Sequence, residues 1–200
     1  GDQLSIASTS DFGFGTGDFT IEFWAKTSSY SSYPYLIDMR DNGNDFGTTN
    51  RITIYIRNAD GLPYLMVNGT QVIAGKTQTT LGSWSHYALA RNSGTTTLYV
   101  NGISQGTWSD NTNYGNAPIV IGQKQGNDNA FNGEISNLRI VKGTAVYTSL
   151  FRPPYEPLTN ITNTKLLCCN NSSITGSTVS PSTISSNGTV TASTDSPFDD

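Results

Sequence analysis

The stretch Asp18-Phe-Thr-Ile-Glu-Phe-Trp-Ala-Lys26 alternates between apolar side chains and a more mixed set along its whole length. Successive side chains of a β-strand point to opposite faces, so this alternation predicts a strand. One face would carry Phe19, Ile21, Phe23 and Ala25, and the other Thr20, Glu22, Trp24 and Lys26. The stretch from Arg51 to Arg57 alternates as strictly. Both stretches predict strands that face a shared apolar core.

Short runs of the same kind continue through the chain, separated by turns rich in Gly, Asn and Ser. They cover Tyr35–Met39, Tyr64–Val67, Gln71–Ala74, His86–Arg91, Thr97–Val100, Ile119–Gly122, Glu134–Val141 and Lys165–Cys169. Two hairpins are expected at Asn68-Gly69 and Asn101-Gly102, because Asn and Gly tolerate the positive φ of a tight turn. No window has the period of an amphipathic helix. We therefore expect an all-β fold, an antiparallel two-sheet β-sandwich.

Composition excludes some classes of function. Only 13% of the 200 residues are charged, and 11 Lys and Arg stand against 15 Asp and Glu, for a net charge of −4. The basic residues are scattered, so the chain has no electrostatic footprint for nucleic acid. Uninterrupted apolar runs reach four residues, far short of the ~20 that cross a bilayer. We expect neither nucleic-acid binding nor membrane insertion.

The composition changes after residue 170. Residues 171–200 are rich in Ser and Thr, contain Pro181 and Pro197, and have no aromatic residue before Phe198. Such a segment lacks the apolar residues for a core of its own. We predict a sandwich over residues 1–170. Residues 171–200 are predicted to be an extended tail, a segment ordered only by a neighbour, or a linker to a further domain.

The two cysteines, Cys168 and Cys169, are adjacent. Neighbouring side chains of a strand point to opposite faces, so a bridge between them would be strained. We expect one buried thiol and one partly exposed thiol, and nothing here requires an oxidising compartment.

Several motifs carry a resemblance to a known family. The stretch from Gly15 to Lys26 looks like the opening strand of concanavalin A-like, laminin-G-like jelly-roll modules. Gly82-Ser-Trp-Ser-His-Tyr-Ala-Leu-Ala-Arg91, followed by Leu98-Tyr-Val-Asn-Gly102, resembles their central signature. Ile121-Gly122 followed by Phe131-Asn-Gly-Glu-Ile135 resembles a later one, and the motifs occur in the family's order. The resemblance implies a jelly-roll sandwich.

A narrower resemblance covers the C-terminal part. Leu138–Tyr147, Phe151-Arg-Pro-Pro154 and Thr164–Leu167 are similar to such modules in bacteriophage virion proteins, especially those of marine phages. Residues 178–198 resemble the segment that follows these modules. The resemblance implies a virion location, with other virion proteins and further copies of the chain as partners. It also implies that the chain is a piece of a longer polypeptide.

The same fold hosts β-glucan hydrolases, and retaining glycosidases need two carboxylates about 5 Å apart. The three glutamates are Glu22, Glu134 and Glu156, none has an acidic residue two positions away, and the paired-acid motif of such hydrolases is missing. Where many relatives carry an acidic pair, this chain has Ser136-Asn137. The one histidine, His86, is expected to be structural. We therefore expect no enzymatic activity and no catalytic residues.

Two loops offer the hard oxygen donors that calcium prefers, Asp41-Asn-Gly-Asn-Asp45 and Asn127-Asp-Asn129. Asp41, Asp45 and Asp128 are the first candidates for metal ligands. Ordinary turn chemistry explains the same residues without a metal, so no cofactor is required.

Two aromatic loops are candidates for ligand binding. Ser28-Ser-Tyr-Ser-Ser-Tyr-Pro-Tyr35 combines rigid amphipathic tyrosines with adaptable serines, and its candidates are Tyr30, Tyr33 and Tyr35. Trp108 and Tyr114 flank a second loop, with Asp110, Asn111 and Asn113 between them. Such aromatics suit stacking on sugar rings, and the alternative is that they pack on neighbouring subunits. Trp24 and Trp84 are expected in the core.

Three functions remain open. The first is a non-catalytic structural or attachment module of a phage virion protein (a fibre, appendage or capsid-surface protein), with host-surface glycans as added ligands. The second is a carbohydrate-binding adhesin module of a secreted cellular protein, located outside the cell. The third is a β-glucan hydrolase.

Overall fold

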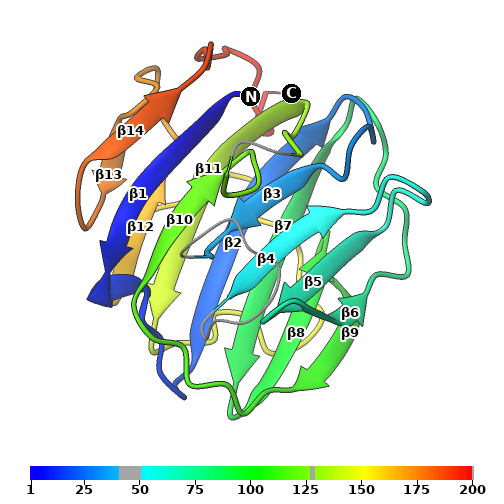
Figure 1. The fold of residues 1–200 in the computed structure, drawn as a ribbon, viewed down its shortest axis with the longest axis vertical. Coiled ribbons are helices and arrows are strands. Elements are labelled where there is room, and N and C mark those ends of the chain that lie inside the picture. Colours follow the sequence, from blue (N-terminus) through cyan, green and yellow to red (C-terminus); the bar gives the residue numbers. More distant parts are fainter. Residues whose placement is uncertain (41–50, 127–128, 200) are drawn as a thin grey trace.

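The computed structural model describes residues 1–40, 51–126 and 129–199. In this part of the chain two seven-stranded sheets pack face to face, and every strand pairing is antiparallel (Figure 1). The first sheet has the order β14-β1-β10-β3-β4-β5-β6, and the second has the order β13-β12-β11-β2-β7-β8-β9. The predicted all-β sandwich is therefore confirmed.

The strand bounds follow in chain order. They are β1 (Gln3–Thr9), β2 (Phe19–Thr27), β3 (Tyr35–Asp38), β4 (Ile52–Ile56), β5 (Pro63–Val67), β6 (Thr70–Ala74), β7 (Trp84–Asn92), β8 (Thr95–Val100), β9 (Ile103–Ser109), β10 (Ala117–Ile121), β11 (Gly133–Lys142), β12 (Thr164–Cys168), β13 (Ser177–Val179) and β14 (Ile184–Asn187). Every stretch predicted as a strand overlaps an observed one, and most of the observed strands begin or end one or two residues outside the predicted bounds. The described helical element, Ser10–Phe12, is a single short turn, and no helix in the described residues is long and apolar enough to cross a membrane.

The core lies between the sheets and follows the predicted alternation of β2. Phe19, Ile21 and Phe23 are fully buried. Phe23 stacks on Tyr87 of β7 with ring centroids 5.2 Å apart. Fully burying a side chain of this size contributes roughly 1.5–3 kcal/mol to the free energy of folding, so this face anchors the sandwich.

Both predicted Asn-Gly hairpins form. Asn68 and Gly69 connect β5 to β6, and both have positive φ, at 50° and 75°. Asn101 and Gly102 connect β8 to β9 with φ of 49° and 78°. Positive φ at both central residues is the mark of the type I′ turn, whose twist matches that of the strands. Each hairpin forms the edge of a different sheet.

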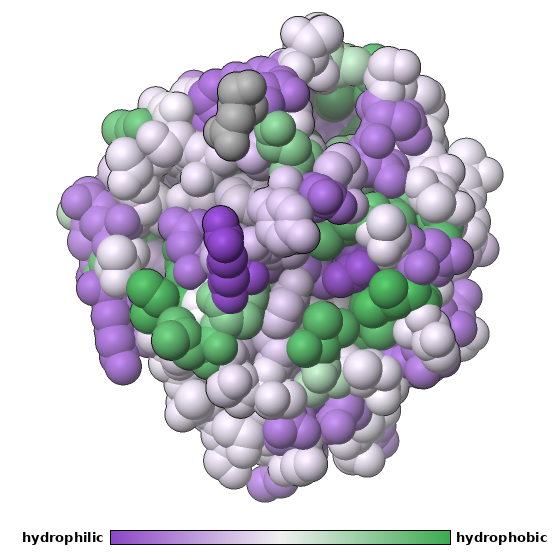
Figure 2. All heavy atoms as spheres, turned by 180° about the vertical axis from the view of Figure 1, so that it is seen from behind, coloured by the Kyte–Doolittle hydropathy of each residue, from purple (hydrophilic) through white to green (hydrophobic). Residues whose placement is uncertain are grey.

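The outer face of the second sheet is also covered, by the segment between β11 and β12 (residues 143–163, the covering segment). Its Tyr147 and Phe151 stack with centroids 3.7 Å apart and pack on Ala88, Ala90 and Tyr99. For this reason the second face of β2, predicted as mixed, is buried as well. On the molecular surface seen from behind, separate apolar patches lie among hydrophilic ones (Figure 2).

The segment after residue 170 is built into both sheets. β13 pairs with β12 and β14 pairs with β1, so the segment supplies an edge strand to each sheet (Figure 1, orange to red). Ile184 is 5% exposed and joins the main core. Residues 171–199, called the tail below, need no core of their own because they complete the core of the sandwich.

Candidate functional site

A pocket of about 330 Å³ lies where the tail passes along the edge of the sandwich. We call it the tail-side pocket. It is walled by the first residues of β1, the starts of β7 and β11, the end of β10, and the tail. Pockets for small ligands begin at about this volume, so a molecule of the size of a sugar ring fits.

Three neighbouring strands present a row of functional side chains beside this pocket. Lys26 at the end of β2 is paired in register with Trp84 of β7 on one side and with Glu134 of β11 on the other. Paired residues of antiparallel strands share a face, so these three side chains lie side by side. The Nζ of Lys26 is 3.6 Å from an Oε of Glu134.

The tail closes onto this row through Asp195. The indole Nε1 of Trp84 donates a hydrogen bond of 2.9 Å to Asp195, and Lys26 forms an ion pair with the same carboxylate. The hydrogen bonds from Lys26 and from Trp84 hold the pKa of Asp195 below its ordinary value. Beyond it, the ring of Phe198 meets the ring of Trp24 edge-on at 5.9 Å.

A second anchor holds the tail to the first residues of the chain. Asp2 accepts a hydrogen bond of 2.8 Å from the backbone N–H of Thr189. The preceding Gly188 has a φ of +82°, and a Cβ at this position would lie 2.3 Å from the Asp2 carboxylate. Only glycine allows this close approach. The tail is thus fixed at two points beside the pocket.

The pocket wall combines aromatic and polar side chains. Trp84 and Phe131 supply aromatic surface, and Asn132, Asn171, Ser173 and Thr191 supply amides and hydroxyls. Asp2, Glu134 and Asp195 add carboxylates, and the described lining residues include no Lys or Arg. This wall can both stack on a ring and hydrogen-bond to hydroxyl groups.

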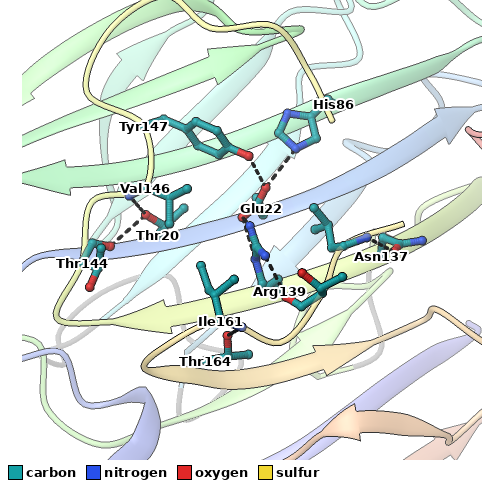
Figure 3. Close-up of polar contacts among 12 residues, drawn as sticks. Thr20, Glu22, His86, Asn137, Arg139, Thr144, Val146, Tyr147, Ile161 and Thr164 are labelled. Atoms are coloured by element: carbon teal, nitrogen blue, oxygen red, sulfur yellow. Dashed lines mark hydrogen bonds and ion pairs between the residues drawn. The ribbon is translucent and has the colours of Figure 1, made fainter. Parts of the chain in front are cut away.

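Glu22, the carboxylate considered for hydrolysis, lies in a separate buried cluster under the covering segment (Figure 3). The Nε and one Nη of Arg139 donate hydrogen bonds of 2.9 and 2.6 Å to Oε1. The hydroxyl of Tyr147 donates to Oε2 at 2.7 Å, and Nε2 of His86 lies 3.3 Å from the same oxygen. The predicted structural role of His86 fits this position, since its ring is fully buried.

The electrostatics of this cluster suit a structural ion pair. Burial alone would raise the pKa of Glu22, but the hydrogen bond to His86 and the charge of Arg139 outweigh it and hold the pKa below its ordinary value. The carboxylate is 0% exposed, so no substrate reaches it in this structure. Glu22 therefore joins β2, β7, β11 and the covering segment.

The three candidate tyrosines of the first loop lie away from the tail-side pocket. Tyr35 is 7% exposed and stacks on Tyr55 at 5.4 Å. Tyr30 is half-buried and donates its hydroxyl hydrogen bond to the carbonyl of Thr79. Tyr33 is 44% exposed, which leaves it the most accessible of the three.

The two candidate residues of the second aromatic loop also differ in their burial. Tyr114 is 3% exposed and donates a hydrogen bond of 3.0 Å to Asp110, so its ring belongs to the core. Trp108 is half-buried on the edge strand β9 and packs partly against the core. Neither residue lines the tail-side pocket.

The candidate calcium ligands Asp41, Asp45 and Asp128 lie outside the described residues. Among residues 1–40, 51–126 and 129–199, no group of three or more His, Cys, Asp or Glu side chains is placed to hold a metal ion.

Sequence reasoning missed the tail-side pocket. Trp84 was expected in the core, and this prediction is wrong, because its ring is half-buried at the first position of β7 and lines the pocket. Trp24 is buried as expected, with 9% of its surface exposed. It lies on the outer face of its sheet and not between the two sheets. The remaining wall comes from residues 2–4, 121–122, 131–136 and 169 and from the tail. The motifs around Trp84, Ile121-Gly122 and Phe131–Ile135 marked some of these positions in advance, but none of them indicated that the residues meet in a pocket.

Comparison with solved structures gives matches of low sequence identity. A protein from Bacteroides ovatus ATCC 8483, assigned as carbohydrate-binding, has a TM-score of 0.65 at 15% identity, over 92% of this chain and 56% of its own. This match extends into the tail, because residues 1–170 alone cannot make up that share. Domain 4 of the extracellular arabinanase AbnA from Geobacillus stearothermophilus, in complex with arabinotriose, has a TM-score of 0.55 at 18% identity, over 72% of this chain and 69% of its own.

A third similar structure is the CBM40 of the IT-sialidase from Ruminococcus gnavus, bound to α2,3-sialyllactose. Its TM-score is 0.52 at 16% identity, and the match covers 66% of this chain and 79% of that one. At these identities the three structures show a shared fold. No curated protein matches the chain by sequence.

A family model matches residues 1–145, which is more than half of the chain. Its description is that of laminin-G-type domains of the concanavalin A-like lectin and glucanase group. The family resemblance of the strand motifs is thereby confirmed. The chain belongs to the concanavalin A-like lectin/glucanases superfamily.

Proposed function

We propose that this chain is a non-catalytic glycan-binding module and that the tail-side pocket is its binding site. The observation that carries the proposal is the pocket of about 330 Å³ with an aromatic wall at Trp84 and Phe131 and a polar wall of amides, hydroxyls and carboxylates. Sugar C–H groups carry partial positive charge and pack on the electron-rich face of an aromatic ring, while the hydroxyls need polar partners. The carbohydrate-binding proteins among the structural neighbours support this proposal.

The charge of the wall favours neutral sugars. Asp2, Glu134 and Asp195 are acidic, and no basic residue is present among the described lining residues. An anionic sugar would meet these like charges, and the nearby cation, Lys26, is already paired with Glu134 and Asp195, which disfavours binding. We therefore expect neutral glycans to bind and sialylated or uronic-acid glycans to be rejected, unlike the sialyllactose held by the Ruminococcus gnavus CBM40.

A glycan-array screen followed by calorimetry on the best ligand tests the proposal. Trp84→Ala is expected to weaken binding at least tenfold, because it removes the stacking surface. Trp108→Ala is the matched control, since Trp108 is also a half-buried strand tryptophan but does not line the pocket. Equal binding by the wild type and Trp84→Ala, with loss on Trp108→Ala or Tyr33→Ala, would move the site to the loops predicted from the sequence. A screen without any bound glycan would contradict the proposal.

The same assay tests the calcium hypothesis. Asp41, Asp45 and Asp128 remain the proposed ligands. Glycan affinity is measured once with added Ca²⁺ and once with a chelator, which compares the protein with and without calcium. A drop in affinity with the chelator, reproduced by Asp128→Asn, supports a calcium site. Unchanged affinity contradicts it.

We also propose that the module belongs to a phage virion protein, where it serves attachment to the host surface. The support is the sequence resemblance of residues 138–198 to modules of such proteins. Mass spectrometry of purified particles would detect the chain if it is a virion component, and light scattering of the purified chain would show whether it forms a homo-oligomer. A chain secreted by cells and absent from particles would favour the adhesin alternative.

A further inference from the structure

Cys168 and Cys169 have an unusual geometry at the wall of the tail-side pocket. Cys168 ends β12 and is fully buried. Cys169 is half-buried and lines the pocket. One thiol is therefore buried and the other partly exposed, as the sequence predicted. Their Sγ atoms lie only 3.7 Å apart. Adjacent side chains of a regular strand point to opposite faces, so this contact needs a separate cause.

The cause is a left-handed backbone at Cys169. Its φ is +56°, a region that residues with a Cβ rarely adopt. The N–H of Asn137 donates a hydrogen bond of 2.8 Å to the carbonyl of Cys169, and Leu138 pairs in register with Cys168. Asn137 itself has a φ of +52° and sits in the bulge of β11. The neighbouring strand therefore holds the turn that brings the two sulfur atoms together.

We propose that Cys168 and Cys169 are a modification site, a dithiol that a small-molecule disulfide such as oxidised glutathione converts to a vicinal disulfide. An S–S bond is about 2.05 Å long, so the sulfur atoms must approach by about 1.7 Å from their present contact. The bond closes a ring that contains the peptide bond between the two residues. This ring would stiffen the pocket wall next to Asn171 and Ser173.

The reaction proceeds by two thiol–disulfide exchanges. The thiolate of Cys169 attacks one sulfur of the small disulfide, forms a mixed disulfide, and releases the first small thiol. Cys168 then loses its proton, attacks the Sγ of Cys169, and displaces the second small thiol. In total, two protein thiols and one small disulfide give one protein disulfide and two small thiols, so the protein is oxidised by two electrons and the small disulfide is reduced.

Accessibility determines the order of these two steps. Cys169 is the thiol exposed at the pocket, whereas the side chain of Cys168 is shielded. The contact with Cys169 and burial both raise the pKa of the Cys168 thiol well above its ordinary value. The second exchange is therefore expected to be slower than the first.

Intact-mass spectrometry of the folded protein tests the proposal. The wild type is incubated with oxidised glutathione, quenched with acid, and measured over time. The expected end product has lost two hydrogen atoms and carries no glutathione, and a reductant reverses it. Cys168→Ser is expected to stop at the glutathione adduct on Cys169, and Cys169→Ser to react at least tenfold more slowly than the wild type.

Three outcomes would overturn the proposal. One is a stable glutathione adduct on the wild type, which would mean that the ring cannot close. Another is a disulfide between two chains on a non-reducing gel, and the third is a folded wild type that does not react. The wild-type result decides the question alone if circular dichroism shows that either variant is misfolded. Peptide mapping after alkylation locates both cysteines in the product.

Discussion

The indole N–H of Trp84 donates a hydrogen bond of 2.9 Å to the carboxylate of Asp195, 111 residues later in the chain. One partner is the first residue of a central strand, and the other lies in the tail. This bond and the Lys26 ion pair hold the tail against the pocket.

Asp195→Ala is therefore expected to loosen the end of the tail. Hydrogen–deuterium exchange of residues 189–198 should become faster, while the strands of the second sheet remain protected, because the contacts of Asp195 are local. Asp199→Ala is the matched control, since that carboxylate lies beyond the anchor. Identical exchange in the wild type and Asp195→Ala would show that the hydrogen bond does not hold the tail.

Replacing Glu22 should destabilise the whole sandwich. Glu22→Gln leaves the guanidinium of Arg139 buried without a charged partner, and breaking a buried ion pair on one side costs about 3–5 kcal/mol. Urea unfolding measures the change. Glu156→Gln, the same substitution at an exposed residue, should change the free energy of unfolding by less than ~0.5 kcal/mol. A loss for Glu22→Gln no larger than that of this control would contradict the structural role of the cluster.

The same carboxylate predicts the acid sensitivity of the fold. The pKa of Glu22 lies below its ordinary value of 4.5, because the hydrogen bond to His86 and the charge of Arg139 outweigh the effect of burial. A lowered carboxyl pKa gives stability that is complete above the unfolded value and is lost as the pH falls through the folded value. Urea midpoints measured from neutral pH down to below 4 should therefore decline less steeply for Glu22→Gln than for the wild type. Parallel curves would argue against this source of acid sensitivity.

Alanine substitutions at two glycines distinguish the cost of backbone strain from the cost of a steric clash. Gly82 and Gly102 have φ of +71° and +78°, so alanine at either site is strained by roughly 1–2 kcal/mol. A Cβ at Gly82 has no neighbour within 4 Å, whereas a Cβ at Gly102 would lie 1.8 Å from the carbonyl oxygen of Phe151. Gly102→Ala should destabilise the protein more than Gly82→Ala in thermal and urea unfolding. Equal losses would mean that the covering segment moves aside at no cost.

The tail is expected to contribute to global stability through Ile184. Ile184→Ala removes a side chain that is 5% exposed in the main core, and such substitutions cost about 2–5 kcal/mol. Ile174→Ala, at a tail residue that is 37% exposed, serves as the control and should cost much less. If the two variants have the same free energy of unfolding, the tail is not part of the cooperative unit.

The strands of the central sheets could be predicted because their pattern is local. The alternation of Phe19, Ile21 and Phe23 identifies β2 without knowledge of any partner strand. The Asn-Gly pairs likewise predict positive φ from the two residues alone. The covering segment could not be foreseen in this way. The alternation of β2 shows two faces but does not show that Tyr147 and Phe151 cover the second one.

The tail-side pocket was beyond sequence reasoning for a similar reason. An edge strand needs only backbone N–H and C=O groups, which every residue except proline provides, so β13 and β14 have almost no apolar signature. The pocket then depends on the meeting of Asp2, Trp84, Glu134 and Asp195, which are far apart in the sequence. The aromatic loops were more conspicuous in the sequence, yet Tyr35 and Tyr114 are used for packing.

The pairing of Gln3 with Asn187 joins the two ends of the described fold and sets an order of events during synthesis. The outer edge of β1 has no partner until the ribosome has made residue 187, and at roughly 5–20 residues per second this takes about ten seconds or more. During this time β1 is a free edge that another nascent chain can pair with. A chaperone that binds the sandwich before β14 is added, or fast synthesis of β14, would therefore limit aggregation of the newly made protein.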